Sequence, residues 1–311
     1  MHRRIASALL PVVATALLVA AAPASAAPPP ATMTLKLGGV NQDKVMILDR
    51  VIAKGTLKPA TGGQRVEVSL LRSGNVLQRR AVSAGDGTYQ AAFRIEKDGT
   101  YKVRAEHAES PDLGAASRTS NRFGVRYPVL RSGNRGPRVR LFNRLLQKKG
   151  YLGSDSSRYT AKTGRGVMAF RKVNGMRRTY SPAGSDIFRK LARNQGGYRL
   201  QHPGSGRHAE VSLRRQVMVL ADGSRVRRIH HVSTGAPSTP TLRGHFNFYR
   251  REPGTNSKGM YYSFYYQGGY AIHGYKSVPT HPASHGCVRT PIPDQKSIYG
   301  WLQMGDSIHI Y

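Results

Sequence analysis

The spacing of hydrophobic residues changes twice along this chain, and that change constrains the fold more than any other feature. Residues 32–126 carry short apolar runs, and Arg65 to Leu70 alternates polar with apolar residues. Such a two-residue period predicts strands with one buried face. Residues 128–197 switch to helical spacing, and residues 198–311 return to strand-like runs. We therefore expect a mainly β, multidomain protein with a helical part in the middle of its 311 residues.

Residues 27–127 are predicted to form a β-sandwich, because several short strands follow one another with turn residues between them. Strands are expected at Lys44–Leu48, Arg65–Leu71 and Thr100–Ala105. A Gly-rich turn, a Val-x-Val strand and the repeats Gly87-Thr88-Tyr89 and Gly99-Thr100-Tyr101 resemble bacterial immunoglobulin-like domains. We interpret this domain as a spacer.

Residues 128–197 are predicted to form a small helical bundle. Three apolar faces recur at helix spacing: Val139, Phe142, Leu145 and Leu146; Val167, Phe170 and Val173; and Ile187, Phe188 and Leu191. We expect Gly150 to cap the first helix and Asn174-Gly175 to end the second.

The same helical segment resembles the peptidoglycan-binding domain type 1. The resemblance rests on Leu130 to Val139, on Gly150-Tyr151 and on Ala169 to Met176. It implies binding to the bacterial cell wall. The segment departs from the family at Asp155–Tyr159, where a glycine-containing loop is usual, and at Phe188, where tryptophan is usual. A helical packing module is the alternative.

Residues 198–311 are predicted to form one mostly β domain with little helix. Strands are expected over Ala209–Leu220, Arg225–Thr234, Phe246–Arg250, Tyr261–Tyr266 and Ser307–Tyr311, and a helix only around Lys296–Leu302. Asp222-Gly223 lies between the first two strands and is typical of a hairpin turn.

Residues 1–26 are typical of a secretory signal peptide. Arg3 and Arg4 precede an alanine-rich apolar run from Ile5 to Ala22, and Ala24-Ser25-Ala26 fits a cleavage site. We expect an exported protein of the cell wall whose mature chain begins near Ala27. An uncleaved membrane anchor is the alternative.

The chain is strongly basic, with 49 Lys and Arg against 16 Asp and Glu and a net charge of +33. Residues 128–197 hold 17 basic and 2 acidic residues, and residues 198–311 hold 14 and 5. Such a field attracts polyanions. Export argues against nucleic acid, so peptidoglycan and anionic wall polymers are the expected partners. The alternative is that the high content of basic residues reflects the general amino-acid composition of the organism's proteins and not a binding partner.

Cys287 is the single cysteine, so the chain has no internal disulfide. An unpaired thiol in an exported protein indicates intermolecular pairing or a reactive group. A nearby histidine can take the proton of a nucleophilic thiol or hold it as an ion pair. His273 and His285 are both candidates, and their spacing from Cys287 leaves the choice open.

Other groups around Cys287 fit acyl transfer. Gly274 and Gly286 would let backbone approach a ligand closely. The amides of Gly286 and Cys287 are candidate oxyanion donors, and Arg289 is a candidate partner for a substrate carboxylate. No histidine–carboxylate cluster has zinc-like spacing, which disfavours metal-dependent hydrolysis.

These residues resemble the L,D-transpeptidase (YkuD-like) catalytic domain, whose signature is His-Gly followed by Ser-His-Gly-Cys. Here the two blocks are His273-Gly274 and Ser284 to Arg289, and the lead-in Tyr265 to Ile272, which contains Tyr270, is also similar. The resemblance covers about the last hundred residues. The gap between the blocks is short for the family, which indicates a trimmed loop over the site.

The resemblance implies a role for each residue and implies that no metal or organic cofactor is required. Cys287 would be the nucleophile and His273 the general base, oriented by the Ser284 carbonyl. His285 and Arg289 would shape the site and hold substrate, together with Gly274, Gly286 and Tyr270.

The implied substrate is a tetrapeptide stem of peptidoglycan. Attack before its terminal D-Ala would release D-Ala and leave an acyl-enzyme, which the side-chain amine of a second stem would resolve into a 3→3 cross-link. The family is generally acylated by carbapenems, so a covalent adduct on Cys287 is expected.

Two other functions stay open at this point. Water in place of the second stem would make the protein an L,D-carboxypeptidase, and the sequence does not separate the two reactions. A wall-binding protein with an inactive site is the alternative from another class. Papain-like and sortase-like enzymes do not carry the Ser-His-Gly-Cys block.

Overall fold

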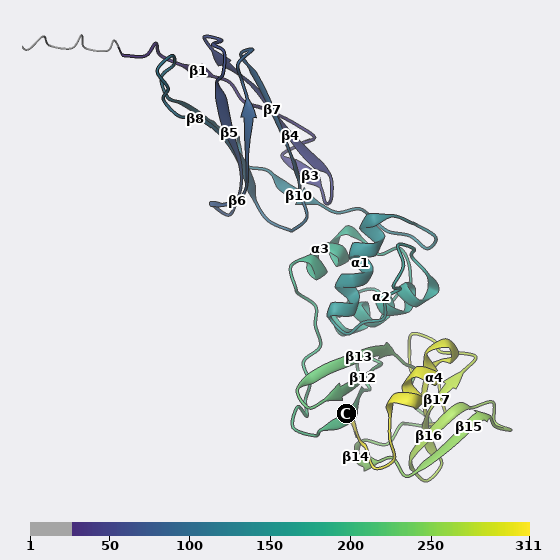
Figure 1. The fold of residues 1–311 in the computed structure, drawn as a ribbon. Coiled ribbons are helices and arrows are strands. Elements are labelled where there is room, and N and C mark those ends of the chain that lie inside the picture. Colours follow the sequence, from purple (N-terminus) through teal and green to yellow (C-terminus); the bar gives the residue numbers. More distant parts are fainter. Residues whose placement is uncertain (1–26) are drawn as a thin grey trace, which may run out of the picture.

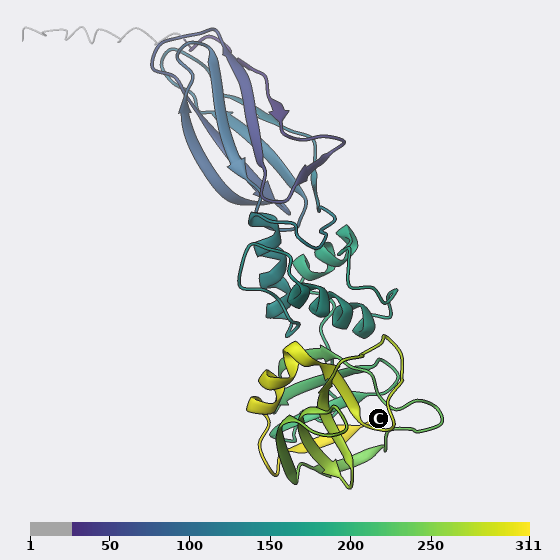
Figure 2. The same cartoon turned by 90° about the vertical axis from the view of Figure 1, so that its right-hand side faces the viewer.

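The computed structural model describes residues 27–311, so the expected signal peptide lies outside the described residues. A β-rich part, a helical part and a second β-rich part follow one another along the molecule (Figures 1 and 2). Within residues 27–311, every helix is too short or too polar to cross a bilayer.

The N-terminal part consists of two antiparallel sheets and one parallel strand pair around one apolar core. Its strands are β1 (Thr32–Met33), β2 (Lys36–Gly38), β3 (Lys44–Met46), β4 (Arg50–Lys58), β5 (Arg65–Arg72), β6 (Asn75–Ser83), β7 (Thr88–Arg94), β8 (Tyr101–His107), β9 (Ala116–Thr119) and β10 (Gly124–Arg126). One sheet has the order β1-β4-β2 with β7 on β4, and the other has the order β6-β5-β8-β9. β3 and β10 pair in parallel.

Alternation along the strands explains this core. Val66 and Val68 of β5 and Val103 and Ala105 of β8 are buried, and they share a hydrophobic cluster with Phe93 of β7 in the facing sheet. The structure therefore contains strands at the three predicted positions. The immunoglobulin-like assignment and its spacer role stay predictions.

The middle part contains α1 (Pro137–Lys148), α2 (Ala161–Val173) and α3 (Ser185–Ala192). Pro137 stands at the start of α1, where its missing N–H costs nothing. Gly150 follows that helix with φ of 83°, as its predicted role as a cap requires. Thr160 caps α2 by accepting from the backbone N–H of Thr163. Gly175 follows α2 with φ of 65°.

The helices do not have a core of their own. Phe142, Phe170 and Phe188 belong to a cluster that also contains Val219 of β12 and Ile229 of β13, in the C-terminal part. The backbone N–H of Ile229 donates to the Gly150 carbonyl at 2.8 Å. The helical segment and the following sheet are thus packed as one body.

Two basic side chains of α2, the partly buried Arg165 and the buried Lys172, strengthen this contact. Arg165 of α2 makes a bidentate ion pair with Asp294, with both N–O distances 2.8 Å. Lys172 of α2 donates to the carbonyls of Gln216 at 3.1 Å and Val232 at 2.8 Å. Burial lowers the pKa of Lys172 to about 7.

The C-terminal part has two sheets with α4 (Ile292–Trp301) packed against the second. Its strands are β11 (Arg207–Ser212), β12 (Val217–Asp222), β13 (Arg225–His231), β14 (Gly244–Asn247), β15 (Arg250–Thr255), β16 (Tyr261–Gln267), β17 (Tyr270–Tyr275), β18 (Val288–Pro291) and β19 (Ser307–Ile310). The sheet orders are β13-β12-β11-β19-β14 and β15-β16-β17-β18. Both sheets contribute to one core.

Three predicted elements were wrong in their extent. The single strand over Ala209–Leu220 is two strands, because the chain turns before Gln216, which adopts φ of 56°. The strand over Phe246–Arg250 is the end of β14 and the start of β15. The last helix begins at Ile292 rather than near Lys296, because Pro293 suits the first turn of a helix.

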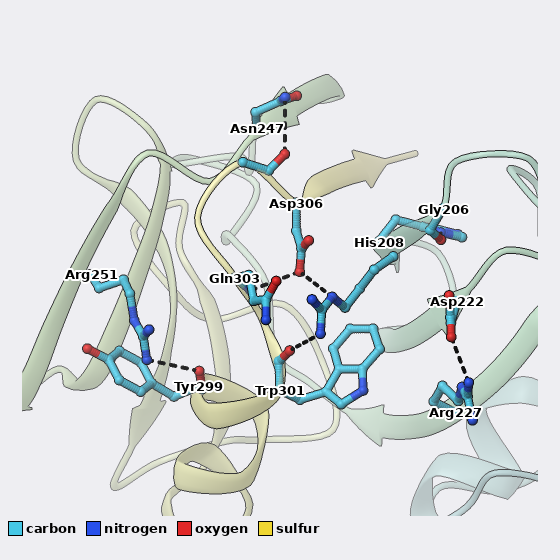
Figure 3. A network of polar contacts seen from close by, with 12 residues as sticks. Gly206, His208, Asp222, Arg227, Asn247, Arg251, Tyr299, Trp301, Gln303 and Asp306 are labelled. Carbon is cyan, nitrogen blue, oxygen red and sulfur yellow. Dashed lines mark hydrogen bonds and ion pairs between the residues drawn. The ribbon is translucent and has the colours of Figure 1, made fainter.

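Polar contacts hold the turn between α4 and β19 (Figure 3). Asp306 accepts from the backbone N–H of Gln303 at 2.8 Å and lies 3.3 Å from Nε of Arg207. Asn247 donates to the Gly305 carbonyl at 3.3 Å. These contacts place β19 between β11 and β14.

Candidate active site

Two adjacent parallel strands bring the sequence blocks together. β17 and β18 pair in parallel, and His273 is the register partner of Arg289. Cys287 directly precedes β18. A parallel pair needs a long connection, and residues 276–287 supply it here as an irregular loop. The reactive residues therefore lie on the edge strand β18 and its neighbour β17, or directly beside them, at one side of the second sheet.

An open pocket of about 520 Å³ contains five of the predicted site residues: His273, Ser284, His285, Cys287 and Arg289. Its other wall comes from β15, β16 and the turn between them. Arg250, Glu252, Asn256, Lys258 and Tyr265 line that wall. Sequence reasoning did not identify the first four of these residues, and the only signal for them was a group of charged residues beside Pro253 and Gly254. Tyr265 lies at the start of the strand that leads into the His273 block.

His273 is buried, with 3% of its surface exposed. Its Nδ1 lies 3.0 Å from the Gly274 carbonyl oxygen. Because a carbonyl only accepts, Nδ1 carries the proton and Nε2 keeps its lone pair. Burial, supported by the nearby Arg289, lowers the pKa of His273 to about 4. The imidazole is therefore a neutral base at physiological pH.

This contact corrects one expectation. The Ser284 carbonyl does not orient His273, because it accepts from the backbone N–H of Ala236 at 2.8 Å and from the hydroxyl of Thr239 at 2.9 Å. Gly274 performs the orienting role instead. The reason is geometric: β17 places the carbonyl of the next residue beside the ring.

Cys287 is half-buried, and its Sγ lies 3.7 Å from the Gly269 carbonyl oxygen. Burial raises the pKa of the thiol, although a backbone hydrogen bond from Ala271 and the charges of Arg289 and Lys258 oppose that shift. Together with the low pKa of His273, this favours a neutral thiol and a neutral imidazole at rest over an ion pair.

The turn before Cys287 is braced by Ser284. Its hydroxyl donates to the Cys287 carbonyl at 2.5 Å and accepts from the Gly286 amide at 3.1 Å. The Gly286 N–H is thus already engaged, and the expectation that it faces an oxyanion was wrong. Gly286 has φ of 106°, and an added Cβ would lie 2.3 Å from Cε1 of Tyr270.

Two other predicted site residues also lie outside the pocket lining. Tyr270 packs over Gly286 and against the core of the C-terminal part. Gly274 is buried, and an added Cβ would lie 3.0 Å from Cβ of Gln295 and 3.1 Å from Cδ1 of Tyr261. Both residues support the site from behind. Among residues 27–311, no group of three His, Cys, Asp or Glu side chains is placed to hold a metal.

Comparison with known families gives this site a context. Residues 206–310 match the family model of the L,D-transpeptidase catalytic domain, YkuD. The C-terminal part is an L,D-transpeptidase-like domain.

Two solved structures are similar to this chain. The L,D-transpeptidase of Xylanimonas cellulosilytica is 28% identical over 59% of this chain and 97% of that one, with a TM-score of 0.54. That coverage exceeds the third of the chain in the family match, so the likeness extends beyond the catalytic domain. The catalytic domain of an E. faecium L,D-transpeptidase acylated by ertapenem is 25% identical over 34% of this chain and 98% of that one, with a TM-score of 0.30. A search of curated proteins returned no match.

A second segment of the L,D-transpeptidase-like domain holds the Cys287 loop in place. Ser233 exchanges two backbone hydrogen bonds with Arg289, at 2.9 and 3.0 Å. The Thr241 hydroxyl donates to the Gly286 carbonyl at 2.7 Å. Sequence reasoning missed these residues, because hydroxyl side chains in a loop carry no motif. The loop is therefore fixed from both sides of the nucleophile.

Proposed function

We propose that this protein is an exported L,D-transpeptidase that forms 3→3 cross-links in peptidoglycan through a Cys287 acyl-enzyme and releases D-Ala. The observation that carries the proposal is the pocket shared by His273, on β17, and Cys287, directly before the adjacent parallel strand β18, in a domain similar to L,D-transpeptidases. Export rests on the sequence of residues 1–26.

The neutral thiol of Cys287 and the neutral imidazole of His273 determine how the first step begins. Nε2 of His273 takes the proton of Cys287 as the sulfur attacks the carbonyl before the terminal D-Ala. The tetrahedral intermediate then collapses, the C–N bond breaks, and the proton on His273 passes to the departing amine of D-Ala. A neutral pair suits this transfer, because the thiolate forms only as the carbonyl is attacked.

The charge that develops on the substrate oxygen needs a donor. Because Ser284 occupies the Gly286 amide, we assign this role to the Cys287 amide. Arg289 lines the pocket with its guanidinium carbon 4.3 Å from the centroid of the Tyr275 ring, which holds the planar fork in place for a stem carboxylate.

We propose that the helical segment contributes to wall binding. It carries a net charge of +15, from 17 basic and 2 acidic residues, and packs on β12 and β13 in the first sheet of the domain that contains the pocket. Peptidoglycan and anionic wall polymers are the proposed partners. A substrate strand held by the helices would thus be held close to the pocket.

The proposal is tested with tetrapeptide muropeptides and the full chain. Mass spectrometry should detect free D-Ala and 3→3 dimers with the wild-type protein. Both products should be absent with Cys287→Ala. His273→Ala should lose far more of the acylation rate than His285→Ala, because His273 is buried and oriented while His285 is exposed. Absence of both D-Ala release and a Cys287 adduct in the wild-type protein would refute the proposed function.

A further inference from the structure

The pocket around Cys287 contains one acidic side chain, Glu252, among cations. Arg250, Lys258 and Arg289 line the same pocket. Three cations favour the carboxylates of a stem peptide and disfavour an ammonium group. A transpeptidase must nevertheless bind an amine, so the position of the single carboxylate matters.

Glu252 differs from the other acidic residues of 198–311, which are occupied within the fold. Those residues are Asp222 paired with Arg227, Asp294 with Arg165, Asp306 with Arg207, and Glu210, which is fully buried and accepts from backbone N–H groups and Tyr311. Glu252 accepts only from neutral groups, the Tyr265 hydroxyl at 2.5 Å and the Asn256 amide at 3.1 Å. It forms no ion pair with any described residue.

The same two contacts fix the orientation and charge of Glu252. They lower the pKa of its carboxyl, with a smaller contribution from Arg250, so the group is ionised at neutral pH. The Arg250 guanidinium carbon lies 3.8 Å from the centroid of the Tyr265 ring. That stacking holds the cation on the aromatic face and leaves the carboxylate without a charged partner.

We propose that Glu252, held by Tyr265 and Asn256, is the acceptor subsite that binds the side-chain ammonium of the second stem peptide. This inference rests on the proposed transpeptidase function and deepens it. An acceptor subsite favours aminolysis of the acyl-enzyme over hydrolysis, and thus cross-linking over carboxypeptidase activity.

The reaction balances as follows. The acceptor arrives as an ammonium ion and loses one proton to water before it attacks. Its nitrogen then bonds to the thioester carbonyl carbon and its second proton passes to Nε2 of His273. The C–S bond breaks, and the Cys287 thiolate takes that proton from His273. The products are an amide, a free thiol and one proton in solution.

The test separates acceptor binding from acylation. The donor is a tetrapeptide whose own side-chain amine is acetylated, and the acceptor is a tripeptide with a free side-chain amine. Mass spectrometry measures released D-Ala, the cross-linked dimer and the hydrolysed tripeptide. In Glu252→Gln, which keeps an oxygen for Tyr265, we expect the dimer-to-tripeptide ratio to fall about tenfold and the acceptor KM to rise.

Controls distinguish this role from a structural one. Asp222→Asn removes one negative charge from the same domain but lies on the β12–β13 hairpin, and its ratio should match the wild type. A carbapenem adduct on Cys287 of Glu252→Gln shows that the pocket is intact. An unchanged ratio in Glu252→Gln would overturn the inference while leaving the proposed function standing.

A second measurement needs no variant. Hydroxylamine is a small nucleophile that is largely uncharged at neutral pH. We expect added salt to weaken the wild-type preference for the cationic stem over hydroxylamine, because salt screens the Glu252 charge. A preference that does not change with salt would contradict the inference. Absence of D-Ala release from the wild type would refute the proposed function itself.

Discussion

The pH dependence of Cys287 acylation follows from the pKa of His273, which burial lowers to about 4. At pH 5.5 a histidine with the usual pKa of about 6.5 would be neutral in only about one molecule in ten. His273 with a pKa of about 4 would stay almost fully neutral. We therefore expect the rate of acylation by a carbapenem to fall less than about twofold between pH 7.5 and 5.5.

Stopped-flow measurement at constant ionic strength gives this rate, and intact-mass spectra confirm the adduct. Circular dichroism at each pH is the control, because protonation of buried histidines in the unfolded chain lowers stability as the pH falls from 6.5 towards 4. His230 is such a residue, since burial lowers its pKa to about 4. A tenfold loss of acylation rate by pH 5.5 in folded protein would refute the neutral-pair account.

Three further predictions concern the interface and the turn. The pKa of Lys172 is about 7 in the fold and 10.5 when unfolded, so the free energy of unfolding should rise by a few kcal/mol from pH 7 to 9.5. Urea unfolding of Lys172→Met should show a smaller rise of the free energy of unfolding with pH. A rise equal to that of the wild type would contradict the assignment. Asp294→Asn leaves the partly buried Arg165, whose side chain is 14% exposed, without its charged partner and should cost about 3 kcal/mol. The paired change Arg165→Met with Asp294→Leu should recover much of that loss in thermal unfolding. Gly286→Ala places a Cβ 2.3 Å from Tyr270 at φ of 106°, so carbapenem acylation should fall at least about tenfold, and a wild-type rate would show that the turn is not constrained.

Much of the fold could be predicted from periodicity and end signals. The alternation from Arg65 to Leu70 predicted β5, and the glycines at 150 and 175 marked the ends of α1 and α2. The period of hydrophobic residues is not altered by one residue in the left-handed conformation. It therefore did not indicate the turn before Gln216. It also shows which face is apolar but not what covers it, and the core shared by α2 and β13 was therefore not foreseen.

The reactive residues could be predicted further than their environment. Cys287 stood out because it is the single cysteine, whereas the choice of His273 over His285 came from the resemblance of the two sequence blocks to the L,D-transpeptidase catalytic domain. Their orientation depends on backbone groups, and no pattern could show that Gly274 rather than Ser284 binds Nδ1 of His273. The opposite wall with Glu252 comes from a strand pair whose contacts arise only in the folded chain.

The central claim is that Cys287 forms an acyl-enzyme with a tetrapeptide stem. It is tested most directly by acid-quenching the full chain with tetrapeptide, digesting it and mapping the adduct by tandem mass spectrometry. The account predicts a tripeptidyl thioester on Cys287, one equivalent of released D-Ala, and neither product in Cys287→Ala. An adduct on another residue, or D-Ala release that persists in Cys287→Ala, would contradict it.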